Sequence, residues 1–95
     1  MKQPAVYILT NKRNDTLYTG VTSNLMERIY QHKNGIKSNF ASKHGCGLLV
    51  YFALYDDMEQ AILEEKRIKG GNRKRKIALI EFMNPQWQDL YETLF

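Results

Sequence analysis

Five side chains of this sequence have the chemistry to act on a phosphate group: Tyr7, Tyr18, Arg28, His32 and Glu65. An arginine presents a planar fork that matches phosphate oxygens, and a histidine binds phosphate or moves a proton near neutral pH. A glutamate can hold a divalent metal ion that polarises the phosphate, and a tyrosine hydroxyl can position a water molecule. Together these residue types point to hydrolysis of phosphodiester bonds, provided that the fold gathers them.

The two tyrosines lie on a predicted hairpin. Residues 5–9 (AVYIL) and 17–21 (LYTGV) are rich in β-branched and aromatic residues and flank a polar stretch. Pairing about the centre of the loop puts Tyr7 opposite, or nearly opposite, Tyr18, and it puts Gly20 near Ala5. A glycine inside a strand often marks close approach by a ligand or another backbone. Plain strand packing of a tyrosine pair, followed by a bend, is the alternative interpretation.

Arg28 and His32 lie one turn apart on a predicted helix that begins after Asn24. Asn24 and Glu27 have the spacing of a capping box. The apolar stripe of this helix is predicted at Leu25, Met26, Ile29 and Tyr30. Side chains four residues apart project side by side, so Arg28 and His32 can reach past the sheet edge where Gly20 leaves room. A solvated pair at the edge of the helix is the alternative.

Glu65 falls on the inward side of a second predicted helix, residues 58–69, which Asp57 caps and a Gly-Gly pair ends. The inward stripe is predicted at Met58, Ala61, Ile62 and Ile68, with Glu59 and Glu64 pointing away. A glutamate in an apolar stripe is unfavourable unless it is paired or binds a metal. A salt bridge to Arg28 is one explanation. A Mg²⁺ site is the other, because Mg²⁺ takes one or two carboxylates and keeps water and substrate phosphates.

The remaining elements complete a small α/β fold. Residues 48–55 predict a third strand, apolar enough on both faces to be central, and residues 35–47 predict a polar loop. A third helix is predicted over residues 73–82, and a short last one carries Trp87, Leu90, Tyr91 and Leu94. The order β-β-α-β-α-α-α predicts a three-stranded, mainly antiparallel sheet flanked by helices, in one domain spanning residues 1–95.

Composition favours a cytoplasmic protein that meets a polyanion. The chain has 95 residues, one cysteine, no apolar run long enough for a membrane span and no apolar leader at its start. Its net charge is +4, and half of its 14 Lys and Arg residues lie within residues 66–76. We call them the basic strip: Lys66, Arg67, Lys69, Arg73, Lys74, Arg75 and Lys76. Such a strip suits a phosphate backbone, although solvated helix ends look alike.

The motifs resemble those of the GIY-YIG nuclease superfamily, and especially its small stand-alone bacterial members. The two name-giving triplets correspond to Ala5-Val6-Tyr7 and Tyr18-Thr19-Gly20. The stretch GVTSNLMERIYQHK resembles the family's arginine helix, AILEEKRIKG its glutamate helix and NPQWQDL the closing motif of the stand-alone members. The resemblance covers nearly the whole chain and implies a β-β-α-β-α core that cleaves DNA with one divalent ion, Mg²⁺ or Mn²⁺.

The resemblance also implies a role for each candidate. Tyr7 would orient or deprotonate the attacking water with support from Tyr18, and Arg28 would stabilise the transition state. Glu65 would hold the metal, His32 would be a second acid/base group or phosphate contact, and Gly20 would be structural. Asn84, with Asn72 as the alternative, matches the family's late asparagine. The DNA-binding candidates are Lys66, Lys69, Arg73, Lys74, Arg75 and Lys76.

Three functions therefore follow from the sequence. The first is a metal-dependent DNA endonuclease of low sequence specificity, acting in DNA processing or repair, with branched or single-stranded DNA as candidate substrates. The second is a non-catalytic nucleic-acid-binding module that uses the basic strip. The third is a small docking protein that uses the aromatic residues Trp87, Tyr91 and Phe95, against which core packing is the simpler explanation.

Overall fold

The computed structural model describes residues 3–35 and 44–95. Its elements in chain order are β1 (Ala5–Thr10), β2 (Leu17–Thr22), α1 (Leu25–Lys33), β3 (Leu48–Leu54), α3 (Met58–Lys69), α4 (Arg73–Met83) and the 3₁₀ helix η1 (Leu90–Leu94). Most of the predicted polar loop, residues 36–43, lies outside the described residues. The predicted α/β class and element order are confirmed, apart from the last helix, which is a short 3₁₀ turn.

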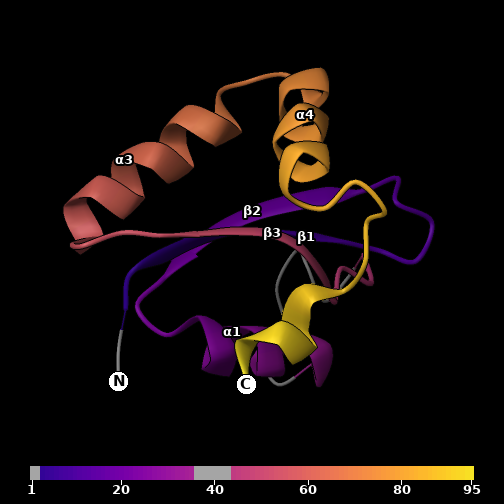
Figure 1. The fold of residues 1–95 in the computed structure, drawn as a ribbon, viewed down its shortest axis with the longest axis horizontal. Coiled ribbons are helices and arrows are strands. Elements are labelled where there is room, and N and C mark those ends of the chain that lie inside the picture. Colours follow the sequence, from indigo (N-terminus) through magenta and orange to yellow (C-terminus); the bar gives the residue numbers. More distant parts are fainter. Residues whose placement is uncertain (1–2, 36–43) are drawn as a thin grey trace.

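The three strands form an antiparallel sheet in the order β2-β1-β3. The prediction that the third strand is central was wrong, because β1 occupies the centre and all six of its residues are buried. Helices cover both faces of the sheet, as Figure 1 shows, so even the edge strand β3 carries apolar residues on both faces. Two-sided apolarity therefore does not identify the central strand here.

The hairpin register differs from the prediction by two residues. Tyr7 pairs with Gly20, Leu9 pairs with Tyr18, and Ala5 pairs with Thr22. The loop of residues 11–16 is short enough for the strands to stay paired up to Thr10 and Leu17, and this closing pair sets the rest of the register. Inside the loop, the Asp15 amide donates to Asn11 Oδ1 at 3.1 Å.

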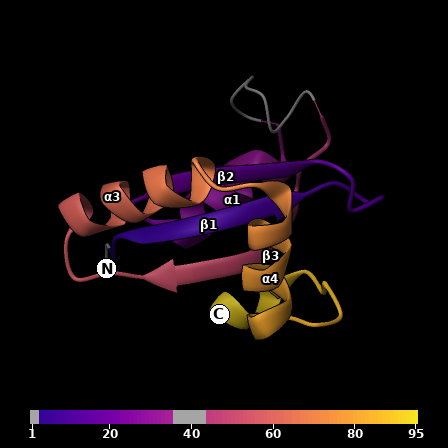
Figure 2. The ribbon, with the colours of Figure 1, turned by 90° about the horizontal axis from the view of Figure 1, so that it is seen from above.

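Two layers of helix enclose the sheet. The helices α1 and η1 lie on one face, whereas α3 and α4 lie on the other (Figure 1). Seen from above, α3 runs along the strands on the side of β2 and β1, and α4 stands near one end of the sheet (Figure 2). Tyr7, Leu9 and Leu49 pack toward α1, and we call this side the α1 face. Val6 and Ile8 pack toward α3 and α4, and we call that side the α3 face.

The helix starts were predicted correctly, and the inward stripes only in part. The Asn24 side chain accepts from the Glu27 amide at 3.2 Å, and Asp57 caps α3 through the Gln60 amide at 2.8 Å. In α1, however, the predicted stripe residues Met26 and Tyr30 are exposed, and His32 is buried with Leu25 and Ile29. In α3 the predicted stripe residue Ile62 is exposed as well. Each helix thus buries a narrower stripe than its apolar residues suggest.

The C-terminal segment is fixed by one aspartate. Asp89 accepts from the backbone amides of Leu49 and Tyr91, each at 3.1 Å, and forms an ion pair with Lys33. This arrangement ties η1 to both β3 and α1. Trp87 lies outside any helix and packs on the α3 face, whereas Tyr91 packs on the α1 face. Within the described ranges, no helix has the length and apolar character that a membrane span requires.

Candidate active site

Tyr7 occupies the centre of the candidate site. Its ring is 1% exposed and lies on the α1 face, directly opposite Gly20 of the edge strand β2. A Cβ atom built on Gly20 would lie 2.5 Å from Tyr7 Cζ and closer still to the hydroxyl oxygen. The space left by this glycine is therefore filled by the tyrosine ring. The predicted close approach at Gly20 is real, and the group that approaches is a side chain of the protein itself.

His32 forms a hydrogen bond with the hydroxyl of Tyr7. The distance from Tyr7 Oη to His32 Nε2 is 3.1 Å, and both groups are buried. The Tyr18 ring closes the cluster, with its centroid 5.7 Å from that of His32 and 6.3 Å from that of Tyr7. The solvated Arg–His edge considered from the sequence is excluded for His32, since its side chain is only 6% exposed. Three residues from β1, β2 and α1 thus form one packed aromatic group.

The environment keeps both partners of this hydrogen bond neutral. Burial, and next the nearby Tyr18, raise the pKa of Tyr7 above its ordinary value, while Arg28 acts in the opposite sense. Burial, and then the positive charge of Arg28, lower the pKa of His32 below 6.5. Within the described residues, His32 Nδ1 is a buried polar atom that lacks a hydrogen-bond partner. A neutral imidazole beside a neutral phenol is able to accept a proton.

Arg28 lies on α1, one turn before His32, and is half-buried. Its charge affects the pKa of both Tyr7 and His32, so the guanidinium lies near their hydrogen bond. In the part of the chain that the structure describes, its side chain has no ion pair or hydrogen bond. A half-buried guanidinium with unused donors is suited to bind an anion that enters the site.

Glu65 reaches the site from the other layer. It is 9% exposed on α3, and its charge also acts on the pKa of the Tyr7 hydroxyl. Its ion-pair partner is Lys69, one turn later on the same helix, with Nζ 2.7 Å from Oε2. The salt bridge to Arg28 that the sequence left open is therefore replaced by a local one. The carboxylate binds a cation in the structure, and that cation is a lysine with half of its side-chain surface exposed.

These residues fit a weakly held divalent ion. In the described ranges, no group of three His, Cys, Asp or Glu residues could enclose a metal. One carboxylate is nevertheless enough for Mg²⁺, which commonly completes its shell with water and substrate phosphates. The pairing of Glu65 with an ammonium group shows that a cation is accommodated at this carboxylate. An exchangeable metal that binds together with a phosphate matches this donor set.

The basic strip is divided by the break between α3 and α4. Arg67 is paired with Glu64, Lys69 is paired with Glu65, and Arg73 donates to the carbonyl of Asn14 at 3.0 Å. The remaining members have no ion pair in the described ranges: Lys66, Lys74, Arg75 and Lys76. Basic residues in the first turn of a helix oppose its dipole, so the cations at the start of α4 do not stabilise it.

Asn84 lies at the end of α4, and its amide group is used entirely by the backbone. Its Nδ2 donates to the carbonyls of Val50 and Gln88, and its Oδ1 accepts from the Gln88 amide at 3.0 Å. The side chain is buried and joins α4 to β3 and to the following segment. The competing candidate Asn72 caps α4 through the Arg75 amide at 2.9 Å. Both asparagines therefore have structural bonds in place.

Sequence reasoning missed two contacts of the site. The hydrogen bond between Tyr7 and His32 depends on tertiary packing, and no local sequence pattern predicts it. The pairing of Lys69 with Glu65 had a signal, because the two residues have the i, i+4 spacing of a helical ion pair. Lys69 was assigned to DNA binding alone, yet its ammonium group lies at the proposed metal ligand.

Comparison with known proteins identifies one family model and several related bacterial proteins. Residues 3–78 match a family model described as the GIY-YIG catalytic domain. A UPF0213 protein of Clostridium perfringens is 40% identical over 75 residues, which are 79% of this chain and 80% of that protein. A UPF0213 protein of Oceanobacillus iheyensis is 35% identical over 85 residues, which are 90% of this chain and 98% of the relative.

A solved structure agrees with the fold. The solution NMR structure of a UPF0213 protein from Bacillus halodurans matches with a TM-score of 0.58 and 27% sequence identity, over 94% of this chain and 93% of the other. The family-model match covers both strands of the hairpin, α1 and α3, and so every residue of the aromatic group and its charged neighbours. The chain belongs to the GIY-YIG family.

Proposed function

We propose that this protein is a divalent-metal-dependent endonuclease that hydrolyses DNA phosphodiester bonds. Membership of a nuclease superfamily supports a nucleic-acid substrate. The observation that carries the proposal is the buried bond between Tyr7 Oη and His32 Nε2 at 3.1 Å, with Arg28 and Glu65 close enough to act on the same hydroxyl. Proton acceptor, anion binder and metal ligand thus converge on one edge of the sheet.

The raised pKa of Tyr7 determines how it takes part. A standing tyrosinate is disfavoured by burial and by Tyr18, so Tyr7 acts as a neutral relay. The attacking water transfers a proton to Tyr7 Oη while the phenolic proton passes to His32 Nε2. This route needs neutral His32 with its own proton on Nδ1, and the lowered pKa of His32 keeps the ring neutral at pH 7. His32 ends as the imidazolium and Tyr7 is unchanged. The hydroxide bonds to phosphorus as the P–O bond to the leaving sugar oxygen breaks, and that oxygen takes a proton from the solvent.

The other residues act on the phosphate. The half-buried guanidinium of Arg28 binds a non-bridging oxygen and offsets the charge that develops there. Glu65 holds Mg²⁺ or Mn²⁺, which when bound supplies electrostatic activation of the phosphate. A metal at Glu65 would take the place of the Lys69 ammonium group, which would then be available to the DNA backbone. The proposed role of this chemistry is DNA processing or repair, with little reading of base sequence.

The test uses matched variants on α3. Purified protein is incubated with supercoiled plasmid, single-stranded DNA and branched DNA, in Mg²⁺ or Mn²⁺ and then with EDTA. Glu65→Gln should abolish nicking, whereas Glu64→Gln, which removes a neighbouring carboxylate paired with Arg67, should retain it. Nicking that is absent with every substrate, or that survives in Glu65→Gln, would overturn the proposal.

The unpaired cations of the basic strip favour one alternative, a non-catalytic nucleic-acid-binding module. That alternative predicts salt-sensitive binding that depends on Lys74, Arg75 and Lys76 and ignores both Glu65 and metal. A triple glutamine variant of these cations and Glu65→Gln therefore separate the two functions. Loss of binding in the first variant, with no nicking by the wild-type protein, would favour the module.

A further inference from the structure

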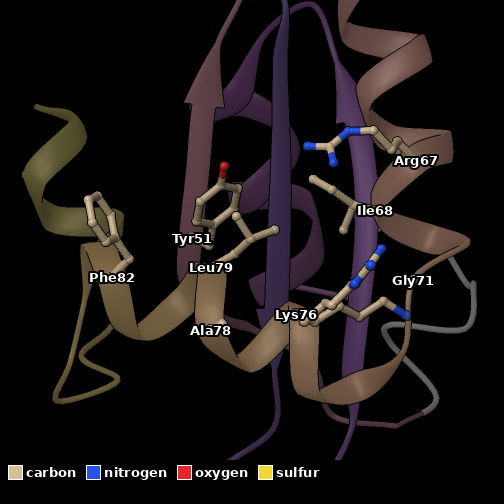
Figure 3. A pocket seen from close by; sticks show the side chains of 9 residues that line it. Tyr51, Arg67, Ile68, Gly71, Lys76, Ala78, Leu79 and Phe82 are labelled. Atoms are coloured by element: carbon tan, nitrogen blue, oxygen red, sulfur yellow. The ribbon is translucent and has the colours of Figure 1, made fainter.

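A cavity of about 570 Å³ lies between α3 and α4, over the sheet residue Tyr51. Figure 3 shows Arg67 and Ile68 entering it from α3 and Leu79 entering from α4. Tyr51, Ile68 and Leu79 all belong to the α3 face, whereas Tyr7 packs on the α1 face. The cavity is thus separate from the candidate active site, although α3 contributes to both.

The two ends of this cavity differ in chemistry. At one end Phe82 is 95% exposed on α4, near Tyr51 in Figure 3. At the other end are Arg75 and Lys76, whose side chains have no ion pair within residues 3–35 and 44–95. The guanidinium of Arg67 also lines the cavity, but Glu64 already neutralises it. An exposed aromatic ring and uncompensated cations therefore border one apolar hollow.

The fitting occupant has a flat apolar part joined to an anion. Phe82 follows Arg75 by seven residues, which is about 10 Å along a helix. An unstacked base can pack on an aromatic ring while its phosphate meets the cations, which is how proteins hold single strands. Stacking on the neighbouring base pairs hides the faces of the bases in a duplex, so a duplex offers only its phosphates to this hollow. Lys66 and Lys74, which do not line the cavity, extend the positive charge beyond it and suit a polymer.

We propose that this cavity binds an unpaired nucleotide of single-stranded DNA, with the base against Phe82 and Tyr51 and the phosphate at Arg75 and Lys76. The inference rests on the proposed function for the choice of DNA as the polymer. It adds that the protein holds a single-stranded part of its substrate on the α3 face, opposite the ring of Tyr7.

The test measures binding in EDTA, so it does not depend on cleavage. An oligonucleotide that carries the fluorescent base 2-aminopurine is titrated with protein, and both its anisotropy and its base fluorescence are recorded. Phe82→Ala should weaken binding at least about five-fold and abolish the change in base fluorescence, because stacking on the ring is lost. Phe82 is almost fully exposed, so this change should leave the fold intact.

A matched pair of cations tests the phosphate end. Lys76→Gln should weaken binding and reduce the fluorescence change, while Lys12→Gln makes the same charge change in the loop between β1 and β2, outside the cavity, and should leave both unchanged. Equal effects of the two variants, an unchanged signal in Phe82→Ala, or equally strong binding of duplex would overturn the proposal. Displacement of the oligonucleotide by micromolar dAMP would also overturn it, since the occupant would then be a free nucleotide.

Failure of the cavity and failure of the cleavage proposal are distinguishable. If the protein nicks plasmid in a metal-dependent way but causes no change in base fluorescence, nucleotide binding in the cavity is refuted and the nuclease proposal stands. If the protein binds the oligonucleotide as described but nicks no DNA, nucleotide binding in the cavity stands and the nuclease proposal is refuted.

Discussion

Replacement of Gly20 by alanine should displace Tyr7, the proposed proton relay. The added Cβ would lie 2.5 Å from Tyr7 Cζ and 3.0 Å from Cε1. Carbon atoms prefer separations of about 3.5–4.0 Å, so the ring must move by roughly 1 Å. The Tyr7 ring is 1% exposed and has no free space to enter. A shift of that size would stretch the 3.1 Å contact with His32 beyond hydrogen-bond length.

The magnitude follows from two opposing effects. Overpacking of a well-packed core costs about 1–3 kcal/mol, and alanine is favoured over glycine inside a strand by roughly 0.5–1 kcal/mol. The free energy of unfolding should therefore fall by about 1–2 kcal/mol. Activity should fall further, because a misplacement of about 1 Å at a reacting group can reduce a rate about 10²-fold. The disproportion between the two losses is the signature of a displaced catalytic group.

Urea unfolding and single-turnover nicking of plasmid measure the two quantities. Gly47→Ala is the control, because the nearest atom to its built Cβ is at 3.8 Å, an ordinary contact. In a Tyr7→Phe background, Gly20→Ala should cause little further loss of nicking. A Gly20→Ala protein that nicks at the wild-type rate would refute the role given to this tyrosine.

Three further predictions concern neighbouring residues. Burial and Arg28 lower the pKa of His32, so the unfolded state binds more protons than the folded state as pH falls from 6.5. The free energy of unfolding, measured by urea titration, should therefore decrease over this range, and His32→Gln should flatten that slope. Lys69→Gln should strengthen Mn²⁺ binding about two-fold, as measured by EPR, because a partly exposed helical ion pair is worth roughly 0.3–0.5 kcal/mol. An unchanged affinity would show that Lys69 does not compete with the metal. Asn84→Ala should lower the free energy of unfolding by about 1–3 kcal/mol through its lost backbone bonds, with the nicking rate of folded protein retained; a stable but inactive variant would contradict its structural role.

Local signals predicted the helices well. Asn24 and Asp57 mark the starts of α1 and α3 because a cap depends on side chains within three residues of it. The inward position of Glu65 followed from helical periodicity alone and is confirmed. These features are short-range, and their physics is contained in the segment itself.

Strand order and register depend on contacts far apart in the sequence. β3 has the apolar pattern of a central strand but lies at an edge, since helices cover both of its faces. The register of the hairpin is set by the cross-strand pairs that run from Ala5 with Thr22 to Thr10 with Leu17. Because that register sets Tyr7 against Gly20, the group that approaches the glycine is a tyrosine ring, a contact that the predicted register did not contain.

The exchange of Lys69 for a metal ion at Glu65 is another feature that one segment cannot decide. The helical spacing favours the ion pair, while the burial of Glu65 and its electrostatic effect on the Tyr7 hydroxyl favour a metal. The structure contains the first arrangement, and the proposed chemistry needs the second.

The central claim is that the Tyr7 hydroxyl carries the proton of the attacking water to His32. Its most direct test is the single-turnover nicking rate of Tyr7→Phe at saturating Mg²⁺ and plasmid, with Tyr55→Phe as a matched loss of a hydroxyl on the α3 face outside the cavity. The account predicts a loss of at least about 10²-fold for Tyr7→Phe, the lower end for a proton-transfer group, and little change for Tyr55→Phe. Equal rates for Tyr7→Phe and wild type would contradict it.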